Sequence, residues 1–223
     1  MRISTTKINT FLWCKRQYQL KYIDKLPVVS TPLMDRGIYV HALLSAYVKG
    51  IEPPVPSNPD IVESAKIMFN NAIKVFKPKK SGLSEIEVSR PYKDDIIMGI
   101  IDYFDNDTLI DFKAIDKPKN YRSPLQLAIY RYLIGQRKEY RYLHIWEKGT
   151  QWLTYTDKDL NFYDEIWQEA IEEIKSYEKE YTLAGIEFPT RKTRFCKQYC
   201  SFYPICFKGI SFEEYKNKIK EAI

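Results

Sequence analysis

Glycine is scarce in this sequence, with 8 residues among 223. None of these glycines falls into the GxGxxG or GxxxxGK spacing that brings backbone amides against a phosphate group. The HExxH motif of zinc proteases and the GxSxG motif of serine hydrolases are also absent. The sequence therefore gives no local support to a dinucleotide-binding, P-loop, zinc-protease or serine-hydrolase function.

Long apolar segments are lacking as well. The longest one, Ile96 to Ile101, is far shorter than the roughly 20 residues that a membrane-spanning helix needs. Residues 1–16 carry four basic side chains but no uninterrupted apolar region of about 7 to 15 residues, which a secretory signal requires. We therefore expect no membrane association and a cytoplasmic location, which is the host cytoplasm if a virus encodes the protein.

The composition predicts a folded core. Hydrophobic residues make up 44% of the chain and aromatic residues 15%, which excludes a disordered or collagen-like protein. A length of 223 residues favours one domain with appendages over two equal domains. The net charge of +6 permits a polyanionic partner but does not require one.

The periodicity of the apolar residues predicts an α/β protein. Helical spacing, with turn and capping signals, covers residues 4–22, 32–49, 60–76, 123–137 and 157–181. Alternating patterns indicate strands at 83–90, 95–104, 108–114, 139–146 and 151–155. The first three strands are expected to form an antiparallel meander. We expect a single domain over 1–223, with a helical part at 1–80, a sheet and helix at 81–156, an acidic helix at 157–190 and a cysteine-containing segment at 191–223.

The predicted meander brings several acidic residues close together. If Asn106 and Asp107 form the centre of the second turn, paired positions sum to 213, so Asp102 faces Asp111. If the first turn centres on residues 94–95, paired positions sum to 189 and Glu87 faces Asp102. A row of carboxylates is destabilising unless protons or a cation offset the repulsion, and hard divalent cations prefer oxygen ligands. The register therefore predicts a metal site.

The unit Asp111-Phe112-Lys113 adds a positive charge to this site. In a strand, Asp111 and Lys113 point to the same face and Phe112 points to the other. Carboxylates can hold Mg²⁺ or Mn²⁺, while Lys113 orients a nucleophilic water or neutralises developing charge. An isolated Asp-x-Lys is usually ordinary strand sequence, but an apolar strand precedes both Asp102 and Asp111 here. His41, which is expected to face inward from the helix at 32–49, could be a ligand or a core histidine.

The sequence contains four cysteines, Cys14 and the cluster Cys196, Cys200 and Cys206. Four thiolates can hold either a zinc ion or an iron-sulfur cluster. Zinc sites more often use two close pairs, so the arrangement of one plus three favours a 4Fe-4S cluster over Zn²⁺. Free thiols are the remaining alternative. A shared centre would connect the two ends of the chain, so its first role would be structural.

The segment around these cysteines is basic and aromatic. Residues 191–208 carry five positive side chains and no negative one. Candidate DNA contacts are Arg191, Lys192, Arg194 and Tyr199, because cations attract phosphates and aromatic rings stack on bases. Solvated lysines around an aromatic core would give the same pattern, and the composition alone does not decide between the two.

These residues together resemble the RecB-like branch of the PD-(D/E)XK nuclease superfamily, especially the CRISPR-associated iron-sulfur exonucleases. The matching motifs cover nearly the whole chain: Arg36-Gly37-x-x-x-His41, Gly99-Ile100-Ile101-Asp102, Asp111-Phe112-Lys113, Gln126-x-x-x-Tyr130 and the four cysteines. The resemblance implies a restriction-endonuclease-like core with a mixed central sheet flanked by helices. It also implies an iron-sulfur segment that joins the N- and C-termini.

The resemblance also implies roles for individual residues. Asp102, Asp111 and His41 would be metal ligands, together with the backbone carbonyl of Phe112. Lys113 would be the catalytic lysine, with Gln126 and Tyr130 contacting a nucleotide or orienting the lysine. Without the resemblance, a core role for Tyr130 is equally compatible with the pattern, and Glu87 could be a solvated strand residue.

The activity implied is that of a Mg²⁺- or Mn²⁺-dependent DNA exonuclease acting on single-stranded ends, with a 4Fe-4S cluster. The resemblance further implies CRISPR adaptation and antiviral defence, or viral or phage recombination and repair, as the setting. CRISPR integration proteins and further copies of this chain would be the partners. The alternatives are a non-catalytic DNA-binding or assembly subunit with the same fold, and a nuclease with zinc in place of the cluster.

Overall fold

The computed structural model describes residues 1–56, 58–117, 122–193 and 196–220, with the side chains of residues 198 and 199 outside the description. The chain forms two compact units. Unit 1 contains Met1–Arg2 and Ser30–Ile166, and unit 2 contains Ile3–Val29 and the residues from Trp167 onward. The expectation of one domain with terminal appendages stays a prediction.

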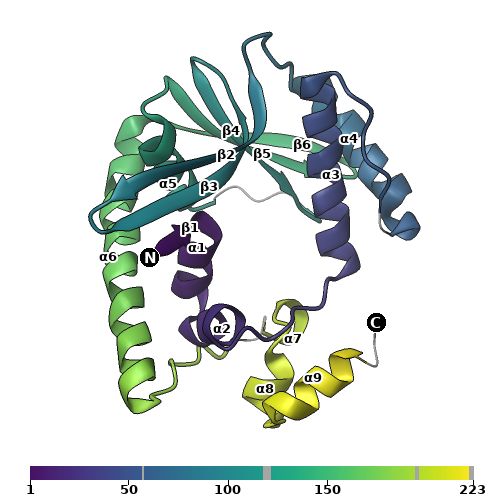
Figure 1. The fold of residues 1–223 in the computed structure, drawn as a ribbon. Helices are drawn as coiled ribbons and strands as arrows, with labels where there is room; N and C mark the ends of the chain where they lie inside the picture. Colours follow the sequence, from purple (N-terminus) through teal and green to yellow (C-terminus); the bar gives the residue numbers. More distant parts are fainter. Residues whose placement is uncertain (57, 118–121, 194–195, 221–223) are drawn as a thin grey trace. The chain divides into compact units, whose positions relative to one another are not determined.

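Unit 1 is built on a mixed sheet (Figure 1). Its strands are β2 (Leu83–Tyr92), β3 (Asp95–Phe104), β4 (Thr108–Ala114), β5 (Glu139–Trp146) and β6 (Gly149–Tyr155), together with the first residue of β1 (Arg2–Ser4), whose other residues belong to unit 2. The order is β1-β3-β4-β5-β6, with β2 also paired to β3. The pairs β2–β3, β3–β4 and β5–β6 are antiparallel, whereas β4 and β5 are parallel. The predicted antiparallel meander is therefore confirmed.

Helices lie on both sides of this sheet (Figure 1). They are α3 (Pro32–Lys49), the short 3-10 helix η2 (Pro59–Ile61), α4 (Val62–Val75) and α5 (Leu125–Ile134). The side chain of Thr31 caps α3 by accepting a hydrogen bond from the Met34 N–H, and α3 ends at Gly50, whose φ of 65° suits glycine. α3 contacts β2, β3 and β4, α4 contacts β5 and β6, and α5 contacts β2 and β3.

The core of unit 1 fixes α3 and α4 against the sheet. From the helices, the core contains Tyr39, Val40, Leu43 and Leu44 of α3, Ala65, Met68 and Ala72 of α4, and Ile61 and Phe76 on either side of α4. From the sheet, it contains Tyr103, Ile110, Phe112, Leu143 and Ile145. Each of these side chains is at least nine-tenths buried. Because burial of one such side chain contributes about 1.5–3 kcal/mol, the position of α3 over β3 and β4 is strongly determined. This packing places His41 beside β3.

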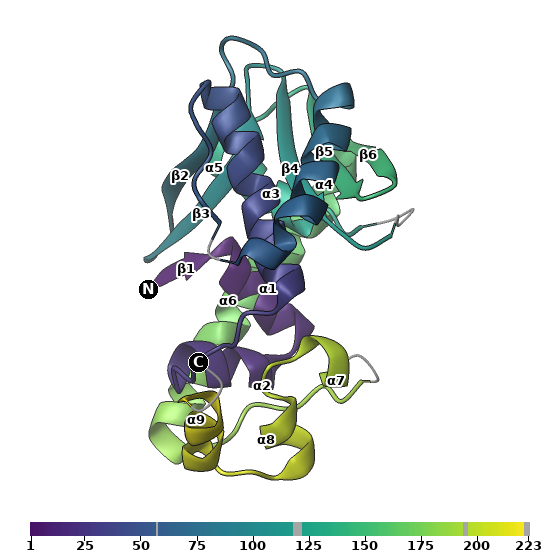
Figure 2. The same ribbon diagram turned by 90° about the vertical axis from the view of Figure 1, so that its right-hand side faces the viewer.

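Unit 2 contains the two ends of the chain. Its elements are α1 (Thr5–Trp13), α2 (Lys15–Tyr18), the π-helix η1 (Gln19–Ile23), the part of α6 (Asp157–Ala184) from Trp167 onward, α7 (Cys196–Tyr199), α8 (Tyr203–Lys208) and α9 (Phe212–Lys220). The Ser4 side chain caps α1 by accepting from the Lys7 N–H. In Figure 2, as in Figure 1, α8 lies beside α9. Their shared core includes Leu20, Phe202 and Tyr215.

An aromatic cluster joins the N-terminal helices of unit 2 to α6. The rings of Phe11 and Tyr18 meet edge to face at 5.5 Å between centroids, and Phe188 stacks on Tyr18 at 6.3 Å. The Tyr18 hydroxyl donates to the Glu178 carboxylate on α6 at 2.7 Å. The Phe188 N–H donates to the buried Gln19 side chain at 2.9 Å. Residues more than 150 positions apart in sequence are therefore fixed together.

The predicted α/β fold, a mixed sheet flanked by helices, is confirmed. The bounds of α3, β3, β4 and β5 coincide with the predicted ones. α5 ends at Ile134 rather than at Arg137, because Gly135 follows with a φ of 82°. None of the helices in the described part of the chain has the length and apolar character needed to cross a bilayer.

Candidate active site

The candidate active site lies where β3 and β4 separate. The pairing of these strands includes Phe104 with Leu109 and Tyr103 with Ile110, which confirms the predicted sum of 213. The next positions along each strand are Asp102 and Asp111. Because no ladder pairing continues there, the Phe112 N–H donates instead to the Asp102 carboxylate at 2.7 Å. The two acids thus occupy the opening of the hairpin.

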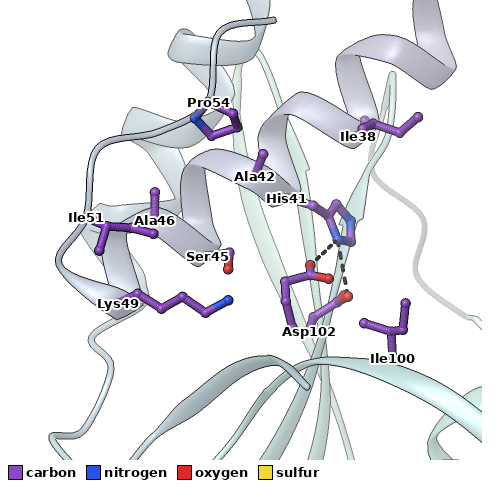
Figure 3. A pocket seen from close by; sticks show the side chains of 12 residues that line it. Ile38, His41, Ala42, Ser45, Ala46, Lys49, Ile51, Pro54, Ile100 and Asp102 are labelled. Carbon is purple, nitrogen blue, oxygen red and sulfur yellow. Dashed lines mark ion pairs between the residues drawn. The ribbon is translucent and has the colours of Figure 1, made fainter. Parts of the chain in front are cut away.

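His41 on α3 faces Asp102 (Figure 3). Its Nδ1 lies 3.2 Å from Asp102 Oδ1 and 3.8 Å from Glu85 Oε1. One ligand atom from each of these three residues lies within 4.8 Å of the others. Burial lowers the pKa of His41, but the Asp102 and Glu85 carboxylates outweigh it and raise this pKa to about 10. A cluster of nitrogen and oxygen atoms at this spacing is suited to a divalent cation.

Burial and the neighbouring charges shift the pKa of Asp102 in opposite directions. Burial raises the pKa of this carboxyl, but the positive charges of His41 and Lys113, with the Phe112 N–H, hold it below its ordinary value. Asp102 is therefore a carboxylate, the form that a metal ligand needs.

The predicted register of the first hairpin is wrong. Paired positions sum to 187 rather than 189, because a two-residue turn at Lys93 and Asp94 joins Tyr92 to Asp95. Lys93 has a φ of 51°, the left-handed conformation that such turns require. Glu87 consequently pairs with Ile100 instead of lying opposite Asp102.

Glu85 occupies the position expected for Glu87. The register sum of 187 places Glu85 opposite Asp102, and its carboxylate completes the cluster with His41 and Asp102. Glu85 has a φ of 53°, which is uncommon for a residue other than glycine. Glu85 could have been predicted from the sequence only by placing a two-residue turn at Lys93 and Asp94. Lysine rarely takes a positive φ, so Lys93 gave no indication of such a turn.

Asp111 is almost completely buried beside Lys113. Its side chain is 1% exposed, and it forms an ion pair with the Lys113 ammonium. Among the described residues, no hydrogen bond of ordinary geometry reaches either carboxylate oxygen. Burial raises the pKa of the Asp111 carboxyl to about 6, and the nearby Asp102 charge acts in the same direction while Lys113 opposes both. A buried carboxylate with so few donors is the kind of group that a cation satisfies.

Lys113 is held by a chain of hydrogen bonds from α5. Its ammonium donates to Gln126 Oε1 at 3.0 Å, and the Gln126 amide donates to the Tyr130 hydroxyl at 2.8 Å. The Tyr130 hydroxyl donates in turn to the Ile100 carbonyl at 2.6 Å. The spacing of four residues puts Gln126 and Tyr130 on one face of α5, as predicted. Between the two predicted functions of this pair, the geometry favours orientation of the lysine.

Two side chains near Lys113 were not predicted from the sequence. Tyr142 on β5 pairs in register with Asp111, and the Lys113 ammonium lies 5.6 Å from its ring centroid. The Arg122 guanidinium lies 5.4 Å from the same ring. The parallel pairing of β4 with β5 creates this arrangement, and no motif in the sequence announces it. Both cations are attracted by the negative face of the ring.

The four cysteines of unit 2 line one small cavity. Cys14 meets Cys196, Cys200 and Cys206 there, together with Thr190, Phe202 and other neighbours. All four are half-buried and none forms a disulfide. Burial raises the pKa of Cys200 to about 11 and also raises that of Cys206, with the other thiols adding to both shifts. The thiols therefore form a set in which a positively charged metal centre would favour the thiolates.

Cations and rings lie next to this cavity in unit 2. The Arg191 guanidinium lies 5.3 Å from the ring centroid of Trp13 and donates to the Trp13 carbonyl at 3.4 Å. The Lys192 ammonium lies 5.5 Å from the ring centroid of Phe207. Arg194 and the side chain of Tyr199 lie outside the described residues. The DNA contacts of these four residues stay predictions.

Solved structures of two other proteins resemble this fold. A candidate exonuclease from Eubacterium rectale matches with a TM-score of 0.61 and 9% identity, over 89% of this chain and 93% of that one. The structure of SSO0001 matches with a TM-score of 0.52 and 17% identity, over 94% of this chain and 87% of that one. At these identities the likeness shows the fold alone. No curated protein matches the sequence.

A family model also matches residues 2–207, a span that contains the acidic cluster, Lys113, α5 and the four cysteines. The model describes nucleases with the Asp/Glu-x-Lys arrangement that the structure places at the opening of the β3–β4 hairpin. The chain therefore belongs to the PD-(D/E)XK nuclease superfamily.

Proposed function

We propose that this protein is a Mg²⁺- or Mn²⁺-dependent exonuclease that hydrolyses DNA from single-stranded ends. The observation that carries the proposal is the convergence of His41, Glu85 and Asp102 beside the Asp111–Lys113 pair. The fold similarity to a candidate exonuclease supports the choice among nuclease activities.

The residues present fit a divalent cation. His41, Glu85 and Asp102 would hold it, with Asp111 as a further ligand whose oxygens otherwise lack hydrogen bonds within the described structure. When bound, such an ion lowers the pKa of a water ligand and stabilises negative charge on the phosphate. The carbonyl of Phe112 as an additional ligand stays a prediction.

Lys113 then has a defined chemical role. Its side chain is 16% exposed, and Gln126 and Asp111 hold its ammonium in one orientation. From there it can donate a hydrogen bond to the attacking water or to a phosphate oxygen. A preorganised donor of this kind stabilises charge as it develops in the transition state, without reorganisation of the solvent.

A 4Fe-4S cluster in unit 2 is the second part of the proposal. Sulfur ligands about 2.3 Å from a tetrahedral zinc ion lie about 3.8 Å from one another. Of the four cysteine sulfurs, all in the described part of the chain, no three lie within 4.8 Å of one another. A cluster binds each thiolate to a different iron atom and so accepts wider spacing. This spacing supports iron-sulfur over zinc.

The biological setting rests on the family resemblance. A role in CRISPR adaptation, or in viral or phage recombination and repair, stays a prediction, as do CRISPR integration proteins and self-association as interactions. An intracellular location also stays a prediction.

Incubation with end-labelled single-stranded DNA tests the proposed function. With Mn²⁺ we expect labelled mononucleotides or short fragments to be released progressively from an end, and we expect EDTA to stop the reaction. Circular single-stranded DNA should resist cleavage if an end is required. DNA binding without any metal-dependent cleavage would contradict the proposal and favour a non-catalytic DNA-binding subunit.

The corrected register predicts different effects for two neighbouring glutamates. Substitution Glu85→Ala should weaken Mn²⁺ binding by about 10-fold or more, because it removes a carboxylate from the cluster. The matched substitution Glu87→Ala should leave Mn²⁺ affinity within about twofold, because Glu87 pairs with Ile100. Isothermal titration calorimetry with Mn²⁺ measures the affinity of each variant. Equal effects of the two substitutions would contradict the assignment of Glu85.

The hydrogen-bond chain from α5 predicts a loss of turnover rather than of substrate binding. Substitution Gln126→Leu removes the acceptor of Lys113, and we expect kcat to fall by about 10- to 100-fold with little change in KM. Gln126→Glu keeps an acceptor for the ammonium and should recover part of the rate. Steady-state kinetics on a single-stranded oligonucleotide separates the two constants. A rise in KM alone would indicate that Gln126 contacts the nucleotide instead.

A further inference from the structure

A cavity of about 620 Å³ extends from the acidic cluster along α3. Its wall includes His41, Asp102, Ser45, Lys49, Ile51 and Ile100, and Figure 3 shows these side chains around one space. The volume is within the range of about 300–1,000 Å³ that small-molecule sites occupy. The cavity can therefore take a nucleotide-sized group next to the cluster.

Three polar side chains of this cavity follow one face of α3. His41, Ser45 and Lys49 are spaced four residues apart, which places them on consecutive turns of the same face. Lys49 lies about 12 Å along the helix axis from His41, given a rise of about 1.5 Å per residue. Within the described residues, no carboxylate forms an ion pair with the Lys49 ammonium, whereas Lys113 at the other end of the site pairs with Asp111. The positively charged Lys49 side chain thus lies farther along α3 than the acidic cluster.

The rest of the wall is aliphatic. Ile38, Ile51 and Ile100 are 66%, 61% and 54% exposed, and Pro54, Ala42 and Ala46 complete the lining. Apart from His41 this lining contains no aromatic ring, and only Ser45 adds a neutral hydrogen-bonding group. Such a surface can contact a sugar or a base through van der Waals contact, but it offers few groups to read the edge of a base.

We propose that this cavity binds the segment of the DNA strand that adjoins the scissile phosphate, with Lys49 and Ser45 contacting a phosphate oxygen of that segment. The proposal rests on the proposed function and adds the path of the strand along α3. The aliphatic side chains contact the sugar and base without selecting a sequence. Lys49 lies two turns of α3 away from His41, so it contacts a phosphate other than the one that reacts. It is therefore a positioning residue.

The salt dependence of DNA binding tests this role. We would measure the anisotropy of a labelled single-stranded oligonucleotide in Ca²⁺ over a series of salt concentrations. Loss of one phosphate contact reduces the slope of log K against log salt by about 0.7 for a single strand. We expect Lys49→Ala to show this reduction, with affinity about 10-fold lower at low salt and similar losses for oligonucleotides of different sequence. Lys66→Ala, on the exposed side of α4, is the matched control and should leave slope and affinity unchanged.

A second substitution tests the cavity independently of Lys49. Ile51→Asp places a negative charge at an exposed position of the wall and should weaken binding of every oligonucleotide, whereas Val75→Asp on α4 should not. Lys49→Ala with an unchanged slope, or a loss confined to one base sequence, would overturn the inference. If the Lys49→Ala result overturns the inference but the unmutated protein cleaves DNA with Mn²⁺, the proposed function survives. If the unmutated protein binds with the expected slopes but never cleaves, the proposed function fails and the binding path stands.

Discussion

Substitution Asp111→Asn should lower kcat for DNA cleavage by about 10³-fold or more. Asparagine keeps the size of the side chain but removes the buried negative charge that faces Lys113. A catalytic ion contributes several kcal/mol, and each 1.36 kcal/mol corresponds to a factor of ten in rate. Release of labelled nucleotides from single-stranded DNA in Mn²⁺, followed under single-turnover conditions, measures the change.

Thermal unfolding distinguishes loss of the ion from loss of the fold. A ligand that binds only the folded protein raises Tm, so Mn²⁺ should stabilise the unmutated protein. The Asp111→Asn variant should fold but show a smaller shift with Mn²⁺. Asp107→Asn is a suitable control, because Asp107 pairs with Lys79 and Lys138 on an exposed turn of the same hairpin. Full cleavage activity in Asp111→Asn would refute the assigned role.

Substitution Cys200→Ser should have the largest effect on stability. The four cysteines join α1 to α7 and α8 around one cavity, so loss of the centre releases both ends of unit 2. Structural metal sites contribute about 10–16 kcal/mol of apparent binding free energy in small domains. Since 1 kcal/mol shifts Tm by about 2–4 °C in a protein of this size, we expect Tm to fall by about 10 °C or more.

Iron and sulfide analysis of anaerobically purified protein gives the second readout. The unmutated protein should contain iron and acid-labile sulfide, and Cys200→Ser should lose most of both. Ser201→Ala, at the adjacent position, should keep the cluster and the Tm. Zinc in place of iron would contradict the cluster assignment while leaving DNA hydrolysis intact. Absence of any metal together with an unchanged Tm in Cys200→Ser would show that the thiols are simply packed side chains.

The contrast between the two hairpins shows how far local sequence can determine a site. The turn before β4 carries Asp105, whose carboxylate accepts hydrogen bonds from the N–H groups of Asp107 and Thr108. Aspartate is typical of such turns, so the register of Asp102 and Asp111 could be predicted. In the first hairpin the turn requires a positive φ at Lys93, and no residue type there indicates it. The assignment of Glu87 failed for that reason.

The sequence alone determined the α/β pattern, the bounds of α3, β3, β4 and β5, the Asp-x-Lys unit and the presence of four candidate thiolates. These features depend on residues close together in the chain, where periodicity, caps and turns act. The tertiary structure decided that Glu85 completes the acidic cluster, that Gln126 holds Lys113 and that Cys14 meets the three distant cysteines. It also decided that α3 forms a cavity with β2 and β3. Such contacts depend on how buried apolar faces pack, and packing is a property of the whole fold rather than of any one segment.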